Sequence, residues 1–158
     1  MLPRQARGFT LIELVAAMIL IGILAAVVLP RMDSSQMFRE IAFSDQTAAA
    51  LRYAQKTAVS HRRLVCVTVA SDQISLGIAS SHPASACGNP LAGPDGQQPA
   101  AISPSDNIAL VAVPAGPLYF QPSGAVTSDG AGATAADFTL TVTNQTPIRV
   151  YGATGDVE

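Results

Sequence analysis

The feature that most constrains this chain is a long apolar run close to its start. Residues 9–29 read FTLIELVAAMILIGILAAVVL and are apolar apart from Thr10 and Glu13. As a helix rising about 1.5 Å per residue, a run of this length reaches about 30 Å, the thickness of a bilayer hydrocarbon core. The residues before it include Arg4 and Arg7 and no acid. The excess of positive charge predicts a single-pass membrane protein with a cytoplasmic N-terminus and an extracytoplasmic body.

Glu13 distinguishes between three interpretations of this run: a cleaved signal peptide, a plain anchor and a specialised helix. An ionisable group inside a membrane span costs about 2.5–3.5 kcal/mol, so it usually has a partner or a task. Cleavage just before Phe9 would leave an α-amino cation within about one helical turn of Glu13, or offer it to Glu13 of a neighbouring molecule. These residues favour a helix that assembles with copies or relatives of itself.

The stretch Arg7-Gly8-Phe9-Thr10-Leu11-Ile12-Glu13-Leu14 resembles the prepilin cleavage site of type IV pilins and type II secretion pseudopilins. This resemblance implies that a prepilin peptidase cuts after Gly8 and methylates the new N-terminus at Phe9. It implies that Glu13 meets the N-terminal amine of an adjacent subunit during assembly, and that Pro30 kinks the helix. The implied partners are the prepilin peptidase, other major and minor pilins or pseudopilins, and the lipid of a bacterial inner membrane.

A second helix is predicted over residues 34–60, which contain no Pro or Gly and are rich in Ala, Gln, Arg and Leu. Pro30 should bend the path between the two helical segments rather than end it. The expected buried face is made of residues three, four and seven positions apart: Ile41, Ser44, Ala48, Leu51 and Ala58. The opposite side carries charges of both signs, which are either solvated or face a neighbour in a filament: Arg39, Glu40, Asp45, Arg52 and Lys56.

The block at residues 50–59, ALRYAQKTAV, followed by strand-forming residues, resembles the H-type minor pseudopilins and the FimT-like and MSHA-type minor pilins. In those proteins a similar Ala-rich segment passes directly into a β-rich head. The resemblance implies an α+β pilin-like fold, in which a long kinked N-terminal helix, transmembrane in its first half, packs on an antiparallel β-sheet head. The expected divisions are a cleaved leader at 1–8, a membrane and assembly helix at 9–30, an amphipathic helix at 31–62 and a periplasmic head at 63–158.

Short strands are expected in the head wherever β-branched or alternating apolar residues lie between turn residues. They are residues 64–69, 74–78, 108–113, 118–120, 138–142 and 148–151. In the fifth of these, Phe138, Leu140 and Val142 should face one way and the intervening threonines the other. Residues 79–107 hold many Gly and Pro breakers and few apolar residues, which predicts a long exposed loop.

Cys66 and Cys87 are the two cysteines of the chain. An extracytoplasmic head lies in an oxidising compartment, which favours a disulfide worth about 3 kcal/mol in the chain-entropy model. Two unpaired thiols remain the alternative, because the sequence does not show how far apart the two residues lie.

Common catalytic patterns are missing from the sequence. The histidines, His61 and His82, stand in no HExxH or Cys/His metal pattern, and no GxSxG or phosphate-binding loop occurs. We therefore expect no catalytic residues, metal or cofactor, and a structural protein rather than an enzyme. A hydrolase would require one histidine to lie beside a Ser and an Asp in a cleft.

Nucleic acid is an unexpected partner, because the formal net charge is −2. Some FimT-like minor pilins bind DNA through basic residues near the C-terminus, whereas this chain ends in Asp156 and Glu158 with Arg149 as the nearby cation. The favoured function is a minor pilin or pseudopilin incorporated through its N-terminal helix. The sequence leaves open whether the filament is a type IV pilus or a type II secretion pseudopilus. The alternative function is a membrane-anchored periplasmic binding or accessory domain that does not polymerise.

Overall fold

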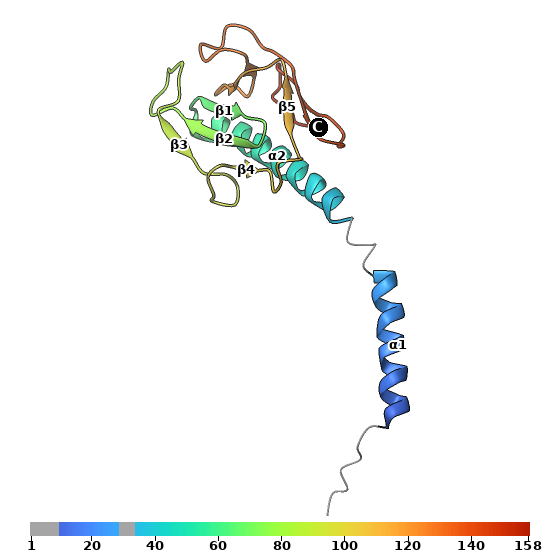
Figure 1. Cartoon of the computed structure of the whole chain (residues 1–158). Coiled ribbons are helices and arrows are strands. Elements are labelled where there is room, and N and C mark those ends of the chain that lie inside the picture. Colours follow the sequence, from blue (N-terminus) through green and yellow to red (C-terminus); the bar gives the residue numbers. More distant parts are fainter. Residues whose placement is uncertain (1–9, 29–33) are drawn as a thin grey trace, which may run out of the picture. The chain divides into compact units, whose positions relative to one another are not determined.

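A computed structural model describes residues 10–28 and 34–158 of the chain. The described residues fall into two compact units, one that contains helix α1 and one that runs from Phe38 to Glu158, here called the head (Figure 1). The predicted leader and Pro30 lie outside the described residues. No helix in the described part of the chain is both long enough and apolar enough to cross a membrane.

Two helices precede the strands in the described part of the chain. Helix α1 spans Leu11–Val28 and helix α2 spans Ser34–His61. The backbone N–H of Arg63 donates to the carbonyl of Ala58, and Arg62 adopts a left-handed φ of 52°. This left-handed residue ends α2 and redirects the chain into the first strand.

Two antiparallel sheets complete the head. The six-stranded sheet has the order β3-β2-β1-β6-β7, with β4 also paired to β2, and the three-stranded sheet has the order β5-β8-β9. The strands are β1 (Val65–Val69), β2 (Gln73–Ile78), β3 (Asn89–Leu91), β4 (Ala101–Ile102), β5 (Leu110–Val113), β6 (Leu118–Phe120), β7 (Val126–Thr127), β8 (Phe138–Val142) and β9 (Ile148–Val150). A helix packed on antiparallel sheets confirms the predicted α+β class.

The core of the head lies between α2 and both sheets. The alternating pattern of β8 is confirmed, since Phe138, Leu140 and Val142 are buried and the two threonines between them are partly exposed. Helix α2 contributes small residues to this core at Ala50, Ala54 and Ala58, each with 0% of its surface exposed. Residues this small let the sheets approach the helix backbone closely.

The buried face of α2 is broader than the predicted one and centred elsewhere. Ala48, Leu51 and Ala58 are buried as expected, whereas Ile41 and Ser44 are only partly buried and lie at the edge of the face. The residues that replace them at the centre are Phe43, Thr47, Ala50 and Ala54. Because two sheets cover α2, more of its circumference is buried than a single apolar stripe predicts.

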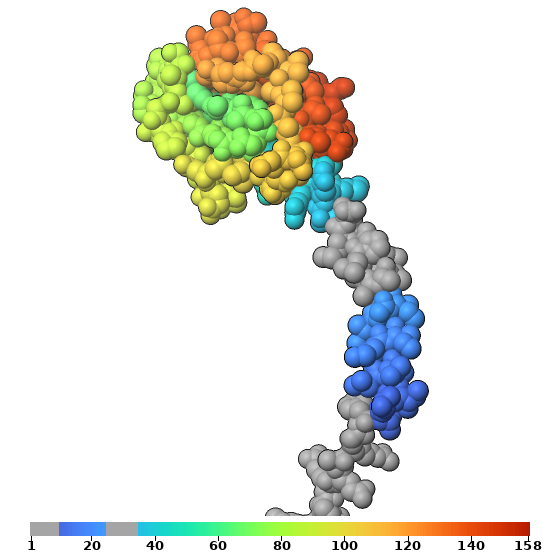
Figure 2. Space-filling model, in the orientation of Figure 1, coloured from blue at the N-terminus to red at the C-terminus, as the bar shows by residue number. Residues whose placement is uncertain are grey.

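Most of residues 79–107 are exposed as predicted, but the prediction of one uninterrupted loop is wrong. This segment contains β3 and β4, which both pair with β2, and it buries Ala79, Ala100 and Ala101. In Figure 2 it forms the yellow-green flank beside the green β1–β2 hairpin. The sequences of β3 and β4 give little indication of a strand, because each strand is only two or three residues long. Pro90 is tolerated in β3 because β3 is an edge strand. Strand β7 was not predicted either, because it is only two residues long.

Candidate functional site

Glu13 lies in the first turn of α1, three residues after Thr10, which caps this helix. Its backbone N–H donates to the carbonyl oxygen of Thr10 at 3.1 Å and lies 3.4 Å from the Thr10 hydroxyl. The N-terminal end of a helix carries partial positive charge, which favours a carboxylate at this position. Local structure therefore places Glu13 at the N-terminal end of α1.

The surroundings of Glu13 within α1 are apolar and uncovered. Every described side chain from Leu11 to Leu24 is exposed, including the large ones of Leu11, Ile12 and Met18. A helix that is apolar all round must be covered when the protein acts, by lipid or by other protein. Gly8, Phe9 and Pro30 lie outside the described residues, so their predicted relation to Glu13 stays a prediction.

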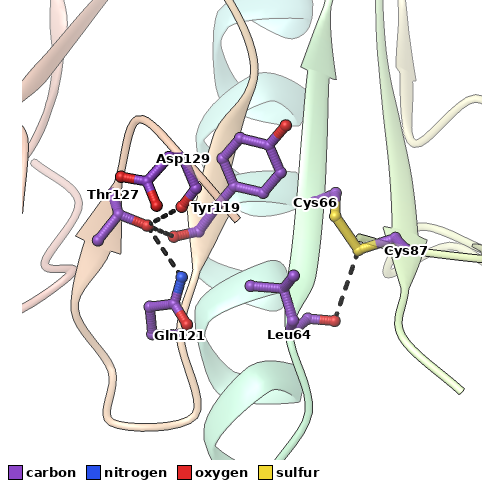
Figure 3. Close-up of a disulfide and its surroundings, with 7 residues drawn as sticks. All are labelled: Leu64, Cys66, Cys87, Tyr119, Gln121, Thr127 and Asp129. Atoms are coloured by element: carbon purple, nitrogen blue, oxygen red, sulfur yellow. Dashed lines mark hydrogen bonds between the residues drawn. A yellow bond between two sulfur atoms is a disulfide. The ribbon is translucent and has the colours of Figure 1, made fainter. Parts of the chain in front are cut away.

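A disulfide joins Cys66 of β1 to Cys87, just before β3. The S–S distance is 1.96 Å and the Cα–Cα distance is 6.0 Å. The Cys87 sulfur also lies 3.6 Å from the carbonyl oxygen of Leu64 (Figure 3). The disulfide therefore ties the segment that follows β2 back onto β1.

Gly77 makes room for this disulfide, a role that sequence reasoning missed. It is the β2 partner of Cys66 in the sheet register. A Cβ atom at Gly77 would lie 3.1 Å from Cys87 Cβ and 3.4 Å from the carbonyl oxygen of Asn89. The Gly within the alternating apolar residues of β2 was the available signal, because a strand Gly often marks a close approach of other backbone.

A hollow of about 490 Å³ lies beside the disulfide on the outer face of the larger sheet. Among the residues lining it are Thr68 and Ser75, which face each other across β1 and β2, and Tyr119 of β6. The ring of Tyr119 stands beside the disulfide in Figure 3. Its described lining holds no carboxylate, imidazole, amine or guanidinium, so it offers no acid–base pair or metal ligand set.

Polar contacts over long sequence distances hold α2 to the rest of the head. Glu40, predicted on the solvated side of α2, is buried, and its Oε1 accepts a hydrogen bond from Asn144 Nδ2 at 3.2 Å. Burial of a carboxylate requires such donors, and this one comes from the β8–β9 turn. The guanidinium of Arg52 donates to the carbonyl of Val157 at 3.1 and 3.2 Å, and Gln55 Nε2 donates to the carbonyl of Thr154 at 3.0 Å.

The two histidines are far apart in the sequence and both are exposed, His61 at the end of α2 and His82 in the segment after β2. Neither lines any of the hollows we describe. Within residues 10–28 and 34–158, no three His, Cys, Asp or Glu side chains are grouped so that they could hold a metal ion.

Two family patterns match the sequence. Residues 3–29 match the prokaryotic N-terminal methylation motif, and residues 44–155 match the family described as type II transport protein GspH. Together the two matches cover the apolar run with Glu13 and most of the head. No curated protein matches the sequence significantly.

Two solved structures resemble the fold, both of the type IV minor pilin FimU from Pseudomonas aeruginosa. The first is 16% identical, covers 79% of this chain and 90% of FimU, and has a TM-score of 0.50. The second is 18% identical, covers 74% and 89% of the two chains, and has a TM-score of 0.46. At this identity the first match supports the fold alone.

Proposed function

Because the chain belongs to the type II transport protein GspH family, we propose that it enters its filament through the apolar N-terminal helix. The chain is a minor pilin or pseudopilin, a structural subunit of a type IV pilus or a type II secretion pseudopilus. The observation that carries the proposal is α1, whose described side chains from Leu11 to Leu24 are all exposed and include one carboxylate, Glu13.

The first step is processing of the precursor. The methylation motif over residues 3–29 supports cleavage by a prepilin peptidase after Gly8 and methylation of the new N-terminus at Phe9. Before processing, the apolar run at residues 9–29 holds the precursor in the inner membrane, with Arg4 and Arg7 on the cytoplasmic side. The head then lies in the periplasm, a compartment in which the Cys66–Cys87 disulfide persists.

The second step is assembly with other pilins or pseudopilins. Apolar side chains of α1 pack among neighbouring helices, where a lone carboxylate is costly unless it is paired. The N-terminal amine of an adjacent subunit supplies that pair for Glu13. The pairing fixes the axial position of one subunit relative to the next, because a shifted subunit would leave both charges buried and unpaired.

We further propose that the protein has no catalytic activity of its own. Pilin and pseudopilin families are structural. The largest hollow that we describe is lined by uncharged side chains. The partners we propose are the prepilin peptidase, other subunits of the filament and membrane lipid, and we propose no nucleic-acid partner and no cofactor.

Glu13→Ala tests the assembly step, with Asp45→Ala as the control that removes an exposed carboxylate from α2 instead. We expect intact mass to show both variants cut after Gly8 when the prepilin peptidase is active. We expect Asp45→Ala to reach the sheared filament fraction and Glu13→Ala to be lost from it.

Equal incorporation of the two variants would refute the role of Glu13. A chain that stays uncut with active peptidase, or one cut beyond Leu29, would refute the whole proposal. Either of these results would favour an anchored or exported domain that does not polymerise.

A further inference from the structure

An apolar groove opens on the head where α2 enters it. One bank is formed by Phe38 and Ala42 of α2, and the other by Ile102 of β4 and the following Pro104. The hollow measures about 240 Å³, and Phe43, which is buried in the core, forms part of its lining. Two segments far apart in the sequence therefore build one apolar surface.

The large side chains at the rim of this groove are left uncovered within the head. Phe38 has 69% of its surface exposed and Ile102 has 55%. Arg39 is the charged residue among the described residues of the lining. Apolar groups gathered beside a cation, rather than scattered singly, mark a surface that meets another body.

We propose that this groove docks on the lipid surface of the membrane in which the precursor is anchored. The inference rests on the proposed membrane insertion of residues 9–29. Phe38 follows Leu29, the last residue of that run, by nine positions. Nine residues span at most about 30 Å in any conformation, so the covalent chain keeps this groove within reach of the membrane surface.

The chemistry of the groove fits the boundary between lipid headgroups and acyl chains. Interfacial segments bury Phe and aliphatic side chains just below the headgroups. The aliphatic stem of Arg39 can follow that apolar surface while its guanidinium meets lipid phosphate. No carboxylate among the described lining residues opposes this contact.

Docking through both sides of the groove restrains the orientation of the head, which a flexible tether alone would not do. The membrane run restrains the head at one point, whereas Ile102 and Pro104 restrain it from a second element. The head of the waiting precursor is then held in one orientation on the membrane, and extraction into a filament must release this contact.

The chain contains no Trp, so single-Trp variants of the full-length protein report position without background. The reporter is Ile102→Trp, and the matched control is Val111→Trp, because Val111 on β5 is an apolar residue with a similar exposed fraction of 58%. A third variant, Leu20→Trp in α1, reports membrane insertion itself. Each variant is reconstituted in phosphatidylcholine–phosphatidylglycerol vesicles with and without brominated lipids, which carry bromine near the top of the acyl chains for Ile102→Trp and Val111→Trp and near the ends of the acyl chains for Leu20→Trp.

We expect brominated lipid to remove most of the fluorescence of Leu20→Trp and Ile102→Trp and to leave Val111→Trp unchanged. Adding Phe38→Ser to the Ile102→Trp chain should restore much of its fluorescence, because the opposite bank is lost. Since Phe38 is exposed, this change should leave the fold intact.

Quenching at Leu20 with none at Ile102 would overturn the inference while leaving the proposed anchor in place, and would assign the groove to another protein subunit. Equal quenching at Ile102 and Val111 would overturn it as well, because contact would then be non-specific. Absence of quenching at Leu20 would refute the membrane insertion on which the inference rests.

Discussion

Removing the disulfide should destabilise the head by an amount set by the length of chain that it closes. Cys66 and Cys87 are 21 residues apart. In the chain-entropy model a loop of this length restricts the unfolded chain by about 3 kcal/mol. A unit of about 120 residues has an unfolding entropy of about 0.25 kcal/mol/K, so Cys66→Ala/Cys87→Ala should lower Tm by about 12 °C.

The chain provides a convenient signal for this measurement. All three tyrosines lie in the head and there is no Trp, so tyrosine fluorescence reports unfolding of the head within the full-length protein. Urea unfolding in mild detergent should give a free energy lower by about 3 kcal/mol for the double variant. Reducing the wild-type protein should reproduce this loss, and the same reductant should leave the double variant unchanged.

The reasoning places the effect in the unfolded state, and this can be refuted. A loss below about 1 kcal/mol would mean that closure of the loop is not what stabilises the head. A loss much larger in the double variant than in the reduced wild type would point to the packing of the sulfur atoms instead. In that case the contact of Cys87 with Leu64 would carry the stabilisation.

Three further predictions test the packing of the head. Leu51→Ala removes a fully buried side chain of α2 and should cost about 2–5 kcal/mol in urea unfolding, whereas Val59→Ala on the exposed side of the same helix should cost well under half as much. Thr47→Val should stabilise the head by about 1 kcal/mol, because the Thr47 hydroxyl is buried and has no hydrogen-bond partner among the described residues; a lower Tm would contradict this. Gly155→Ala should be more destabilising than Gly96→Ala, since both have positive φ but a Cβ at Gly155 would collide with the carbonyl of Gly124, whereas one at Gly96 meets open space. Similar Tm values for the two Ala variants would show that the backbone near Gly155 yields easily.

The helices and the regular strands could be predicted because their signals are local. The alternation of Phe138, Thr139 and Leu140 indicates which side of β8 is buried without knowledge of its neighbours. A run of 28 residues suited to helix specifies α2 in the same way. Glu13 stands out because it is one carboxylate in an apolar segment.

The features that were missed depend on residues far away in the chain. Glu40 is buried with a hydrogen bond from Asn144, which lies 104 positions later in the chain. The residues near Glu40 in the sequence therefore do not indicate that it is buried. Strands β3 and β4 exist because β2 offers them an edge, and their own residues resemble loop sequence. The groove at Phe38 and Ile102 likewise appears only once β4 is placed beside α2.

The two units of this chain differ in how their apolar groups are covered. In the head, α2 and both sheets bury Phe43, Phe120 and Phe138 almost completely, so the core needs no partner. In α1, the described apolar side chains from Leu11 to Leu24 are exposed, so nothing in the described chain covers them. The hydrophobic free energy still to be gained therefore lies in α1. On the proposed route from a membrane into a filament, a subunit built in this way exchanges lipid for neighbouring helices around α1 without unfolding its head.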